Sequence, residues 1–274
     1  MKLFLNLFFI LFLFSFGKDY KLLYYPTGEY ISFNKMIDMF MKADVVYLGE
    51  IHSKKEIHDF QLDVIKAIYE REPYIAIAME MFQAPFQKYL DKYVECEIDE
   101  DKMLELTEYK KRWKFDINLY RDIWRFAKEN GIRIIAMNIP TELLKEIREK
   151  GLENVKSEYL PDKFYEPTDT YKKLLFEALE SHKIKDVKRF FDIQMAWDNG
   201  MALSLYKAIW SGEYEKIIVI VGFGHVYLGQ GIPTALIGMS GPLIQYVVLP
   251  GKDKYVIMPV TLPEEEDEED ELML

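Results

Sequence analysis

The chain has a single cysteine, Cys96, among its 274 residues. One cysteine cannot close an internal disulfide, and it cannot supply the thiolates of a cysteine-based zinc or iron–sulfur site. It also stands outside any C-x-x-C-H haem-attachment string. Any metal held by side chains of this protein must therefore use His, Asp, Glu or Tyr.

Positive charge is also in short supply, since 35 Lys and Arg stand against 46 Asp and Glu, for a net charge of -11. The unbroken acidic run at 264–271 supplies -8 of this charge, so the rest of the chain carries about -3. The sequence has no G-x-x-x-x-G-K-[ST] phosphate loop and no RNA-binding aromatic string. We therefore expect no nucleic-acid partner, and we expect the acidic tail, residues 263–274, to be disordered by self-repulsion.

Long apolar runs are confined to the N-terminus. Lys2 precedes the run Leu3–Phe16, and small residues stand at the positions expected before a cut ahead of Lys18. This pattern predicts a cleavable signal peptide over residues 1–17 and an exported protein, which in a bacterium would be periplasmic. The run has about 14 residues where a membrane span needs about 20, and an uncleaved N-terminal anchor is the alternative. No cysteine follows the signal, so we expect no lipid anchor.

The remaining chain has globular composition, with 50% hydrophobic and 30% charged residues. Short apolar runs rich in β-branched residues alternate with segments of helical periodicity. The middle runs hold almost no polar residues, which is typical of parallel strands buried on both faces. The predicted strands are Leu22–Tyr25, Val45–Gly49, Tyr74–Glu80, Arg133–Asn138, Lys216–Gly222, Gln245–Leu249 and Val256–Leu262.

The alternation of strands and helices predicts an α/β fold with a mostly parallel central sheet and flanking helices. Two long regions without strand signals, 84–114 and 141–211, are predicted to be helical additions over the carboxyl ends of the strands. No Pro/Gly/Ser linker separates them, so we expect one domain over residues 18–262. The predicted helices between strands are Phe33–Lys42 after a Ser32 cap, Lys54–Arg71 after a Ser53 cap, and Tyr120–Asn130 ended by Gly131.

Polar side chains with catalytic or ligating chemistry close several of the predicted strands. Glu50 and His52 follow one strand, His58 lies on the helix after it, Glu80 ends a second strand, and His225 follows a third. Ligands of open α/β sheets bind at the carboxyl ends of the strands. We therefore expect Glu50, His52, Glu80 and His225 to converge at one edge of the sheet.

Each of these residues also has a purely structural interpretation. A Gly-x-x-His sequence after a strand can be a tight turn whose His only forms a loop hydrogen bond, and His58 can hold its helix in the same way. Glu80 costs stability at the end of an apolar strand unless it is paired or bound to a ligand. Imidazoles and carboxylates together suit zinc, manganese or iron. The sequence therefore predicts a metal site whose candidate ligands are His52, His225, Glu50, Glu80 and His58.

A further polar stripe lies on the helical pattern at 186–210. Gln194, Trp197 and Asp198 have the i, i+3, i+4 spacing that places side chains on one helix face. This stripe is either the polar edge of an amphipathic core helix or a second layer in which Asp198 and Gln194 orient a histidine. His182 stands in a charged stretch and is predicted to be solvated.

Taken together, these motifs resemble the ChaN family of haem-binding, iron-regulated proteins. The resemblance spans about Asp44 to Pro233, and paired Gly-x-x-His motifs are shared with the wider superfamily of Tiki metalloproteases and erythromycin-esterase-like hydrolases. Many ChaN proteins are lipoproteins, whereas this chain lacks the lipid-bearing cysteine. The resemblance rests on the order of the segments 49–52, His58 with Gln61, 79–82, 194–202, 222–226 and 229–233.

The resemblance implies two functions of different classes. The first is an exported protein of haem or iron acquisition or handling, with haem in an apolar cleft and a homodimer as one arrangement. Tyrosine is one known iron ligand, and the candidates are Tyr89, Tyr93, Tyr109 and Tyr120. The alternative is a metal-dependent hydrolase in which Glu50 acts as general base and Glu80 as ligand or partner base. A binding protein with a vestigial site is a third interpretation.

Overall fold

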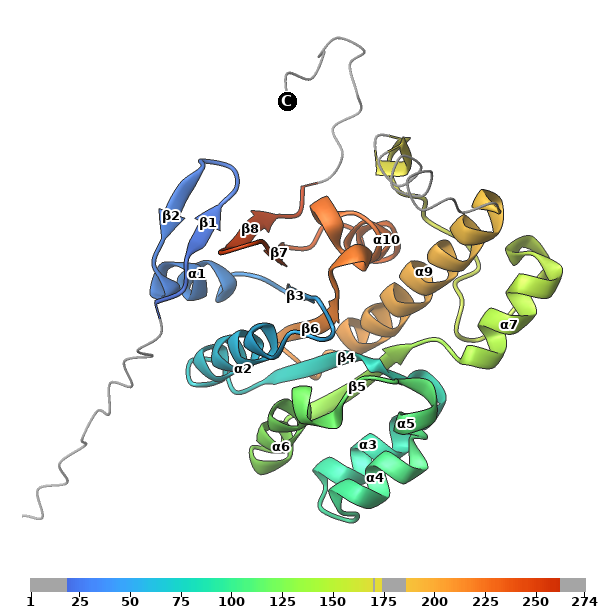
Figure 1. Ribbon diagram of the computed structural model, residues 1–274, viewed down its shortest axis with the longest axis horizontal. Coiled ribbons are helices and arrows are strands. Elements are labelled where there is room, and N and C mark those ends of the chain that lie inside the picture. The colour runs from blue at the N-terminus through green and yellow to red at the C-terminus, as the bar shows by residue number, and fades with distance from the viewer. Residues whose placement is uncertain (1–18, 170, 174–185, 262–274) are drawn as a thin grey trace, which may run out of the picture.

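The computed structural model describes residues 19–169, 171–173 and 186–261 (Figure 1). The predicted signal peptide, the acidic tail and His182 lie outside the described residues. Eight strands form one sheet in the order β2-β1-β8-β7-β3-β6-β4-β5. They are β1 (Leu22–Tyr24), β2 (Glu29–Ile31), β3 (Val45–Glu50), β4 (Ile75–Gln83), β5 (Arg133–Asn138), β6 (Lys216–Gly222), β7 (Gln245–Pro250) and β8 (Tyr255–Pro259).

The predicted mostly parallel α/β sheet is confirmed. Only the neighbouring pairs β1–β2 and β7–β8 are antiparallel, and the other pairs of the sheet order are parallel. The helices are α1 (Phe33–Phe40), α2 (Lys55–Tyr69), α3 (Gln87–Val94), α4 (Glu100–Leu106), α5 (Tyr109–Arg112), α6 (Arg121–Glu129), α7 (Thr141–Lys150), α9 (Val187–Ser211) and α10 (Ile232–Ser240). Short 3₁₀ turns are η1 (Ala84–Phe86), η2 (Ile117–Leu119), η3 (Leu152–Asn154), η4 (Phe223–His225) and η5 (Tyr227–Gly229).

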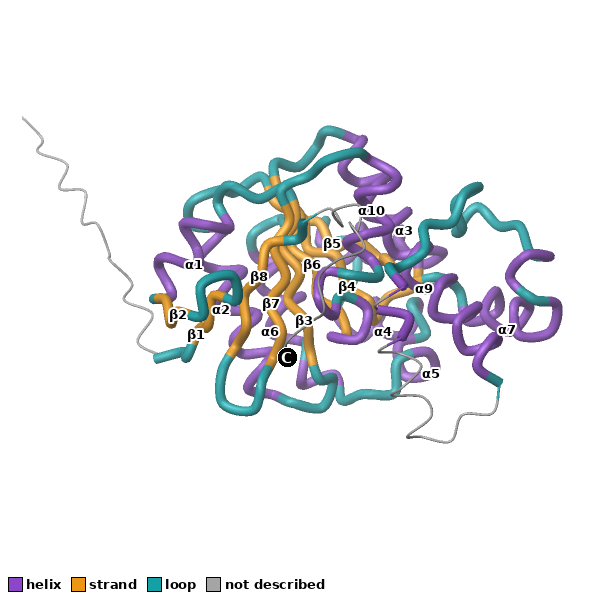
Figure 2. The backbone as a smooth tube through the Cα atoms, turned by 90° about the horizontal axis from the view of Figure 1, so that it is seen from above, coloured by secondary structure: helices purple, strands orange, loops and turns teal. Residues whose placement is uncertain are grey.

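Alternate residues of the central strands enter two separate cores, one on each face of the sheet. Val46 and Leu48 of β3 pack in a core with α1, α2 and α6, whereas Val45 and Tyr47 pack in a core with α9 and α10. Helices accordingly lie on both sides of the strand layer (Figure 2). This burial on both faces explains why the strands were readable as continuous apolar runs.

The structure corrects several local predictions. Strand β4 runs to Gln83 rather than ending at Glu80. Strand β2 was missed because it is a three-residue edge strand, Glu29–Ile31, with two of its residues exposed. Helix α2 begins at Lys55 with Lys54 as its N-cap and no side-chain cap hydrogen bond, so the Ser53 cap is wrong. Strand β8 ends at Pro259 rather than at residue 262. The Ser32 cap of α1 is confirmed, since its hydroxyl accepts a hydrogen bond of 3.2 Å from the Lys35 amide.

Among the described residues, the segment 84–114 contains η1, α3, α4 and α5, and the segment 141–211 contains α7, η3 and α9. Helix α9 runs along the sheet. Its later residues Met201 and Leu205 pack on the strands, while its earlier residue Asp198 reaches the carboxyl ends. Within the described part of the chain, no helix is long and apolar enough to cross a membrane.

Candidate functional site

The side chains of Glu50, His52, Glu80 and His225 meet at the carboxyl edge of the sheet, around Gly222. Glu50 pairs with Gly222 in the β3–β6 register, and the Gly222 amide donates a hydrogen bond of 2.6 Å to Glu80 Oε2. A Cβ atom on Gly222 would lie 2.9 Å from His52 Cε1 and 3.4 Å from Glu80 Oε2. The predicted convergence is therefore present, and it needs glycine at this strand end. We call these four residues with Asp198 the strand-end cluster.

Glu50 is a buried acceptor for several donors. His52 Nδ1 lies 2.8 Å and the Tyr120 hydroxyl 2.6 Å from Glu50 Oε1. The other oxygen, Glu50 Oε2, accepts a hydrogen bond of 3.0 Å from Gln61 Nε2. Burial, followed by the charge and hydrogen bond of Glu50, raises the pKa of Tyr120 well above its ordinary value. Glu50 thus ties β3, α2 and the start of α6 together at one point.

His58 is buried beside this carboxylate, and both of its ring nitrogens face protein oxygens. Nδ1 lies 3.0 Å from Gln61 Oε1, and Nε2 lies 3.0 Å from the backbone carbonyl of His52. Gln61 in turn donates to the carbonyl of Leu48. In this arrangement His58 fixes the turn that carries His52, which is the structural role considered for it.

A second histidine–carboxylate pair joins the turn η4, which follows β6, to helix α9. His225 Nδ1 lies 2.6 Å from Asp198 Oδ1, and its Nε2 lies 3.5 Å from Glu80 Oε1. Gln194 Nε2 donates a hydrogen bond of 3.1 Å to each carboxylate oxygen of Asp198. In this geometry Asp198 and Gln194 lie behind a histidine, which is one of the two interpretations of the polar stripe.

The charges of the cluster raise the pKa values of its two histidines and lower the pKa of Glu80. Burial alone would lower the pKa of His225, but the carboxylates of Glu80 and Asp198 outweigh it and raise this pKa to about 10. Burial would raise the pKa of Glu80, yet His225, His52 and the Gly222 amide together lower it. Burial would likewise lower the pKa of His52, but its hydrogen bond to Glu50 and the charge of Glu80 outweigh burial and raise this pKa.

Within the described residues, no group of three or more His, Cys, Asp or Glu side chains has an arrangement that could hold a metal ion. The imidazoles and carboxylates of the cluster are instead paired with one another. The assignment of His52, His225, Glu50, Glu80 and His58 as metal ligands stays a prediction.

Three of the four candidate haem-ligating tyrosines lie in the core. Tyr93, Tyr109 and Tyr120 are at most 2% exposed, and Tyr120 is committed to Glu50. Tyr89 is half-buried on α3, where its ring stacks on Phe86. None of the three buried phenols reaches a ligand at the surface without rearrangement.

Exposed apolar side chains surround the strand-end cluster. They account for five of the ten large hydrophobic residues exposed on the described chain, each 37–43% exposed. Ile51 and Phe223 directly follow β3 and β6, and the Phe115 ring lies 4.8 Å from that of His52. We call the set the apolar rim: Ile51, Phe115, Phe223, Tyr227 and Leu228. Sequence reasoning missed the rim, although apolar residues directly after two strand ends were a readable signal.

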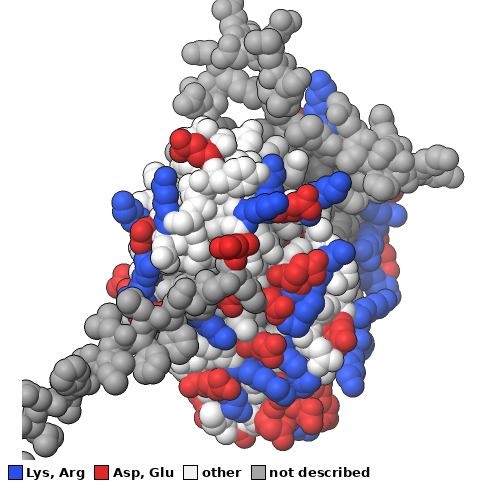
Figure 3. All heavy atoms as spheres, turned by 60° about the vertical axis from the view of Figure 1, so that its left-hand side comes forward, with Lys and Arg blue, Asp and Glu red and all other residues white. Residues whose placement is uncertain are grey.

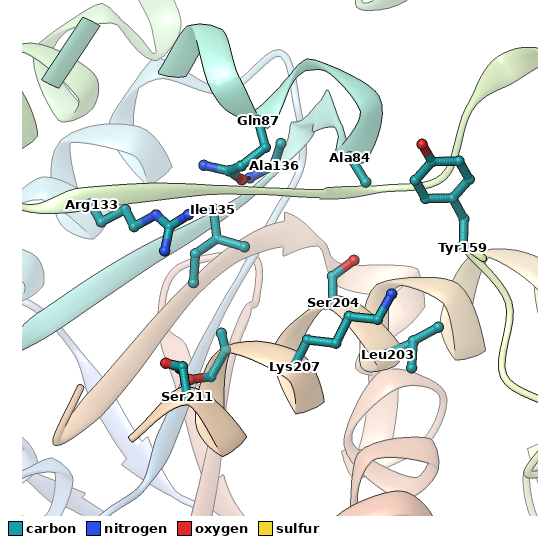
Figure 4. A pocket seen from close by; sticks show the side chains of 11 residues that line it. Ala84, Gln87, Arg133, Ile135, Ala136, Tyr159, Leu203, Ser204, Lys207 and Ser211 are labelled. Carbon is teal, nitrogen blue, oxygen red and sulfur yellow. Dashed lines mark hydrogen bonds between the residues drawn. The ribbon is translucent and has the colours of Figure 1, made fainter. Parts of the chain in front are cut away.

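A hollow away from the strand-end cluster lies between β5, α3 and α9 (Figure 4). Its polar groups are already engaged. The Gln87 side chain donates a hydrogen bond of 2.8 Å to the Ile134 carbonyl and accepts one of 2.7 Å from the Ala136 amide. Arg133 forms an ion pair of 2.9 Å with Asp91. This hollow therefore offers few free polar groups to a ligand.

Fold and site together define an α/β protein with a histidine–carboxylate cluster at the carboxyl edge of a mostly parallel sheet. The family model for haem-binding uptake proteins of the ChaN type, Tiki superfamily, matches residues 36–236. The chain belongs to this family, and the resemblance drawn from its motifs is confirmed.

Solved structures share the fold. ChaN of Campylobacter jejuni, described with cofacial haem binding, has a TM-score of 0.66 and 22% identity, covering 86% of this chain and 95% of its own. The C-terminal region of Pasteurella multocida toxin, described with a thiol-protease-like catalytic triad, has a TM-score of 0.50 and 13% identity. That match covers 87% of this chain and 29% of the toxin chain. A search of curated proteins gives no significant match.

Proposed function

We propose that this protein binds haem at the apolar rim and serves in haem or iron acquisition or handling. The observation that carries the proposal is the rim itself. It is a cluster of exposed apolar side chains at the sheet edge where the family's motifs meet, and it includes one exposed phenol, Tyr227. A porphyrin face buries favourably against such side chains, and bound haem would supply an iron with an open axial position.

Tyr227 is the best-placed iron ligand on the described chain. It lies on η5, two residues after His225, and its ring is 6.4 Å from that of Phe223. At 41% exposure its hydroxyl can reach a ligand without disturbing the core, unlike Tyr93, Tyr109 or Tyr120. Tyr89 is the remaining accessible candidate from the sequence, but it lies on α3 and outside the rim.

The relative from Campylobacter is described with cofacial haems, and a homodimer with two rims facing each other is the corresponding arrangement for this chain. Each rim would cover one face of one haem. In a dimer with the two rims facing each other, the two haems would lie face to face and each would cover the open face of the other.

A titration of hemin into the purified mature protein tests the proposal. We expect a shifted Soret band that saturates at one haem per chain, and sedimentation velocity should show dimers forming with the same stoichiometry. A spectrum equal to that of free hemin, at protein concentrations up to the micromolar range, would reject haem binding.

A cleft beside Ile51 supports an orientation for the haem carboxylates. It is lined by Lys21, Lys54, Lys252 and Lys254, none of which has an ion-pair partner among the described residues. Three acidic residues share this cleft, and on the face of the molecule seen in Figure 3 basic and acidic side chains are interspersed. The lysines thus make a local contact for carboxylates rather than a broad positive field.

Replacing Lys54, Lys252 and Lys254 together by Gln should weaken hemin binding about tenfold, because exposed ion pairs contribute up to about 1 kcal/mol each and are screened by salt. The matched probe is hemin dimethyl ester, which lacks the carboxylates and should bind parent and variant equally. Equal loss for both probes would mean that the lysines do not contact the carboxylates.

We further propose that the protein is exported, on the strength of the N-terminal apolar run. Mass spectrometry of protein from the native cell should give an N-terminus near Lys18. An intact Met1 on protein recovered from the cytosol would contradict export.

A further inference from the structure

The cleft beside Ile51 gathers positive charge that its surroundings do not neutralise. No Asp or Glu in the described part of the chain lies within ion-pair distance of its lysines, although three carboxylates border the same cleft. Unpaired charges of one sign attract a segment of the opposite sign. We call the four residues the lysine cluster: Lys21, Lys54, Lys252 and Lys254.

The C-terminal segment leaves the sheet next to the apolar rim. Val260 follows β8 and packs against Gly229, where a Cβ atom would lie 3.6 Å from Val260 Cγ1. Gly229 directly follows Leu228 of the rim. Thr261 is the last described residue before the acidic run and shares a hollow with Lys163. The acidic run therefore begins beside the proposed haem site.

The acidic run is long enough to reach the lysine cluster. Tyr255 borders the cleft and starts β8, and Thr261 stands six residues later, just beyond the end of this strand. At about 3.3 Å per residue, the two residues are separated by at most about 20 Å. The ten residues at 262–271 extend up to about 33 Å. Eight of them, 264–271, are acidic.

We propose that the acidic run at 264–271 binds the lysine cluster of the same chain and competes there with the carboxylates of haem. Individual exposed ion pairs are weak, but a tethered run has a millimolar effective concentration at the cluster. A haem carboxylate then has to displace the run. The inference rests on the proposed haem binding, because it concerns the lysines assigned to the haem carboxylates.

Hemin titration at about 50 mM salt tests the competition, because exposed charges are weakly screened there. The full mature chain is compared with a chain ending at Pro263 and with a full-length chain carrying Glu→Gln or Asp→Asn at every position of 264–271. Both changes should raise the affinity for hemin about fivefold, as expected for a run that occupies the cluster in about four-fifths of the molecules.

The lysine substitution and the tail deletion should not be additive. In the chain ending at Pro263, replacing Lys54, Lys252 and Lys254 by Gln should weaken hemin binding about 50-fold, five times the loss of about tenfold expected for the full chain. The difference arises because the substitution also releases the run in the full chain. Equal losses in the two chains would overturn the proposal.

Hemin dimethyl ester is the matched probe, since it lacks the carboxylates that compete with the run. It should bind the full mature chain, the truncated chain and the amide-substituted chain equally. A gain for the ester equal to the gain for hemin would place the run over the apolar rim instead of on the lysines, and would overturn the proposal.

Cross-linking tests the contact without haem. A zero-length carbodiimide joins a carboxylate to an amine that it contacts, and mass spectrometry of the full mature chain should find 264–271 linked to the lysine cluster. Links to Lys163 alone, the lysine that shares a hollow with Thr261, would overturn the proposal. Failure of every chain to bind hemin would reject the proposed function, and the cross-links would still decide whether the run occupies the cluster.

Discussion

Tyr227→Phe should weaken hemin binding about 100-fold or more, equivalent to about 2.7 kcal/mol, and should abolish the spectrum of a tyrosinate-ligated iron. Phenylalanine keeps the ring that packs against Phe223 and removes only the oxygen. The loss can therefore be assigned to coordination rather than to a collapsed rim. Absorption and electron paramagnetic resonance spectra of the hemin complex, with the dissociation constant from titration, are the measurements.

The control for this experiment is Tyr74→Phe. Tyr74 is exposed like Tyr227 but precedes β4, at the opposite edge of the sheet, so its loss should leave hemin binding unchanged. If Tyr89→Phe rather than Tyr227→Phe removes the ligand, the iron lies against α3 and the rim is not the haem site.

Glu50→Ala should lower the free energy of unfolding by about 3–5 kcal/mol. The change leaves the buried hydroxyl of Tyr120, the Gln61 amide and His52 Nδ1 without their shared acceptor. Urea unfolding followed by circular dichroism measures the loss. Glu129→Ala, an exposed glutamate at the end of α6, should stay within about 0.5 kcal/mol of the parent.

A second substitution separates unpaired donors from a general packing defect. In the Glu50→Ala background, Tyr120→Phe removes the stranded hydroxyl and should recover part of the stability, whereas in the parent it should be destabilising. If Tyr120→Phe costs the same in both backgrounds, Glu50 does not act as the common acceptor.

The convergence of the strand-end cluster could be predicted because it depends on a regular feature. Parallel strands place their carboxyl ends at one edge, and the apolar runs that lead to Glu50, Glu80 and His225 are recognisable in the sequence, although β4 continues past Glu80 to Gln83. For Asp198, helical spacing predicted a face shared with Gln194 and Trp197 but left open whether that face lies behind a histidine. These inferences needed element type and direction, but no loop geometry.

The contacts that the sequence could not supply depend on irregular segments. Tyr120 was considered as an iron ligand, but the turn η2 before α6 directs its hydroxyl to Glu50, 70 residues earlier in the sequence. No periodicity encodes such a contact. The apolar rim was missed because its five residues come from three separate segments, after β3, before η2 and on η4–η5, and only the two residues directly after strand ends gave a readable signal.

The side chain of Gln87 has a consequence for how copies of this protein can associate. Its amide engages an outward-facing carbonyl and an outward-facing N–H of β5 as a neighbouring strand would, and at the other border of the sheet β2 has only three residues. Neither border is therefore a good template for adding strands from a second molecule. Self-association by extending the sheet is disfavoured, which leaves face-to-face contact through side chains as the available mode of dimerisation.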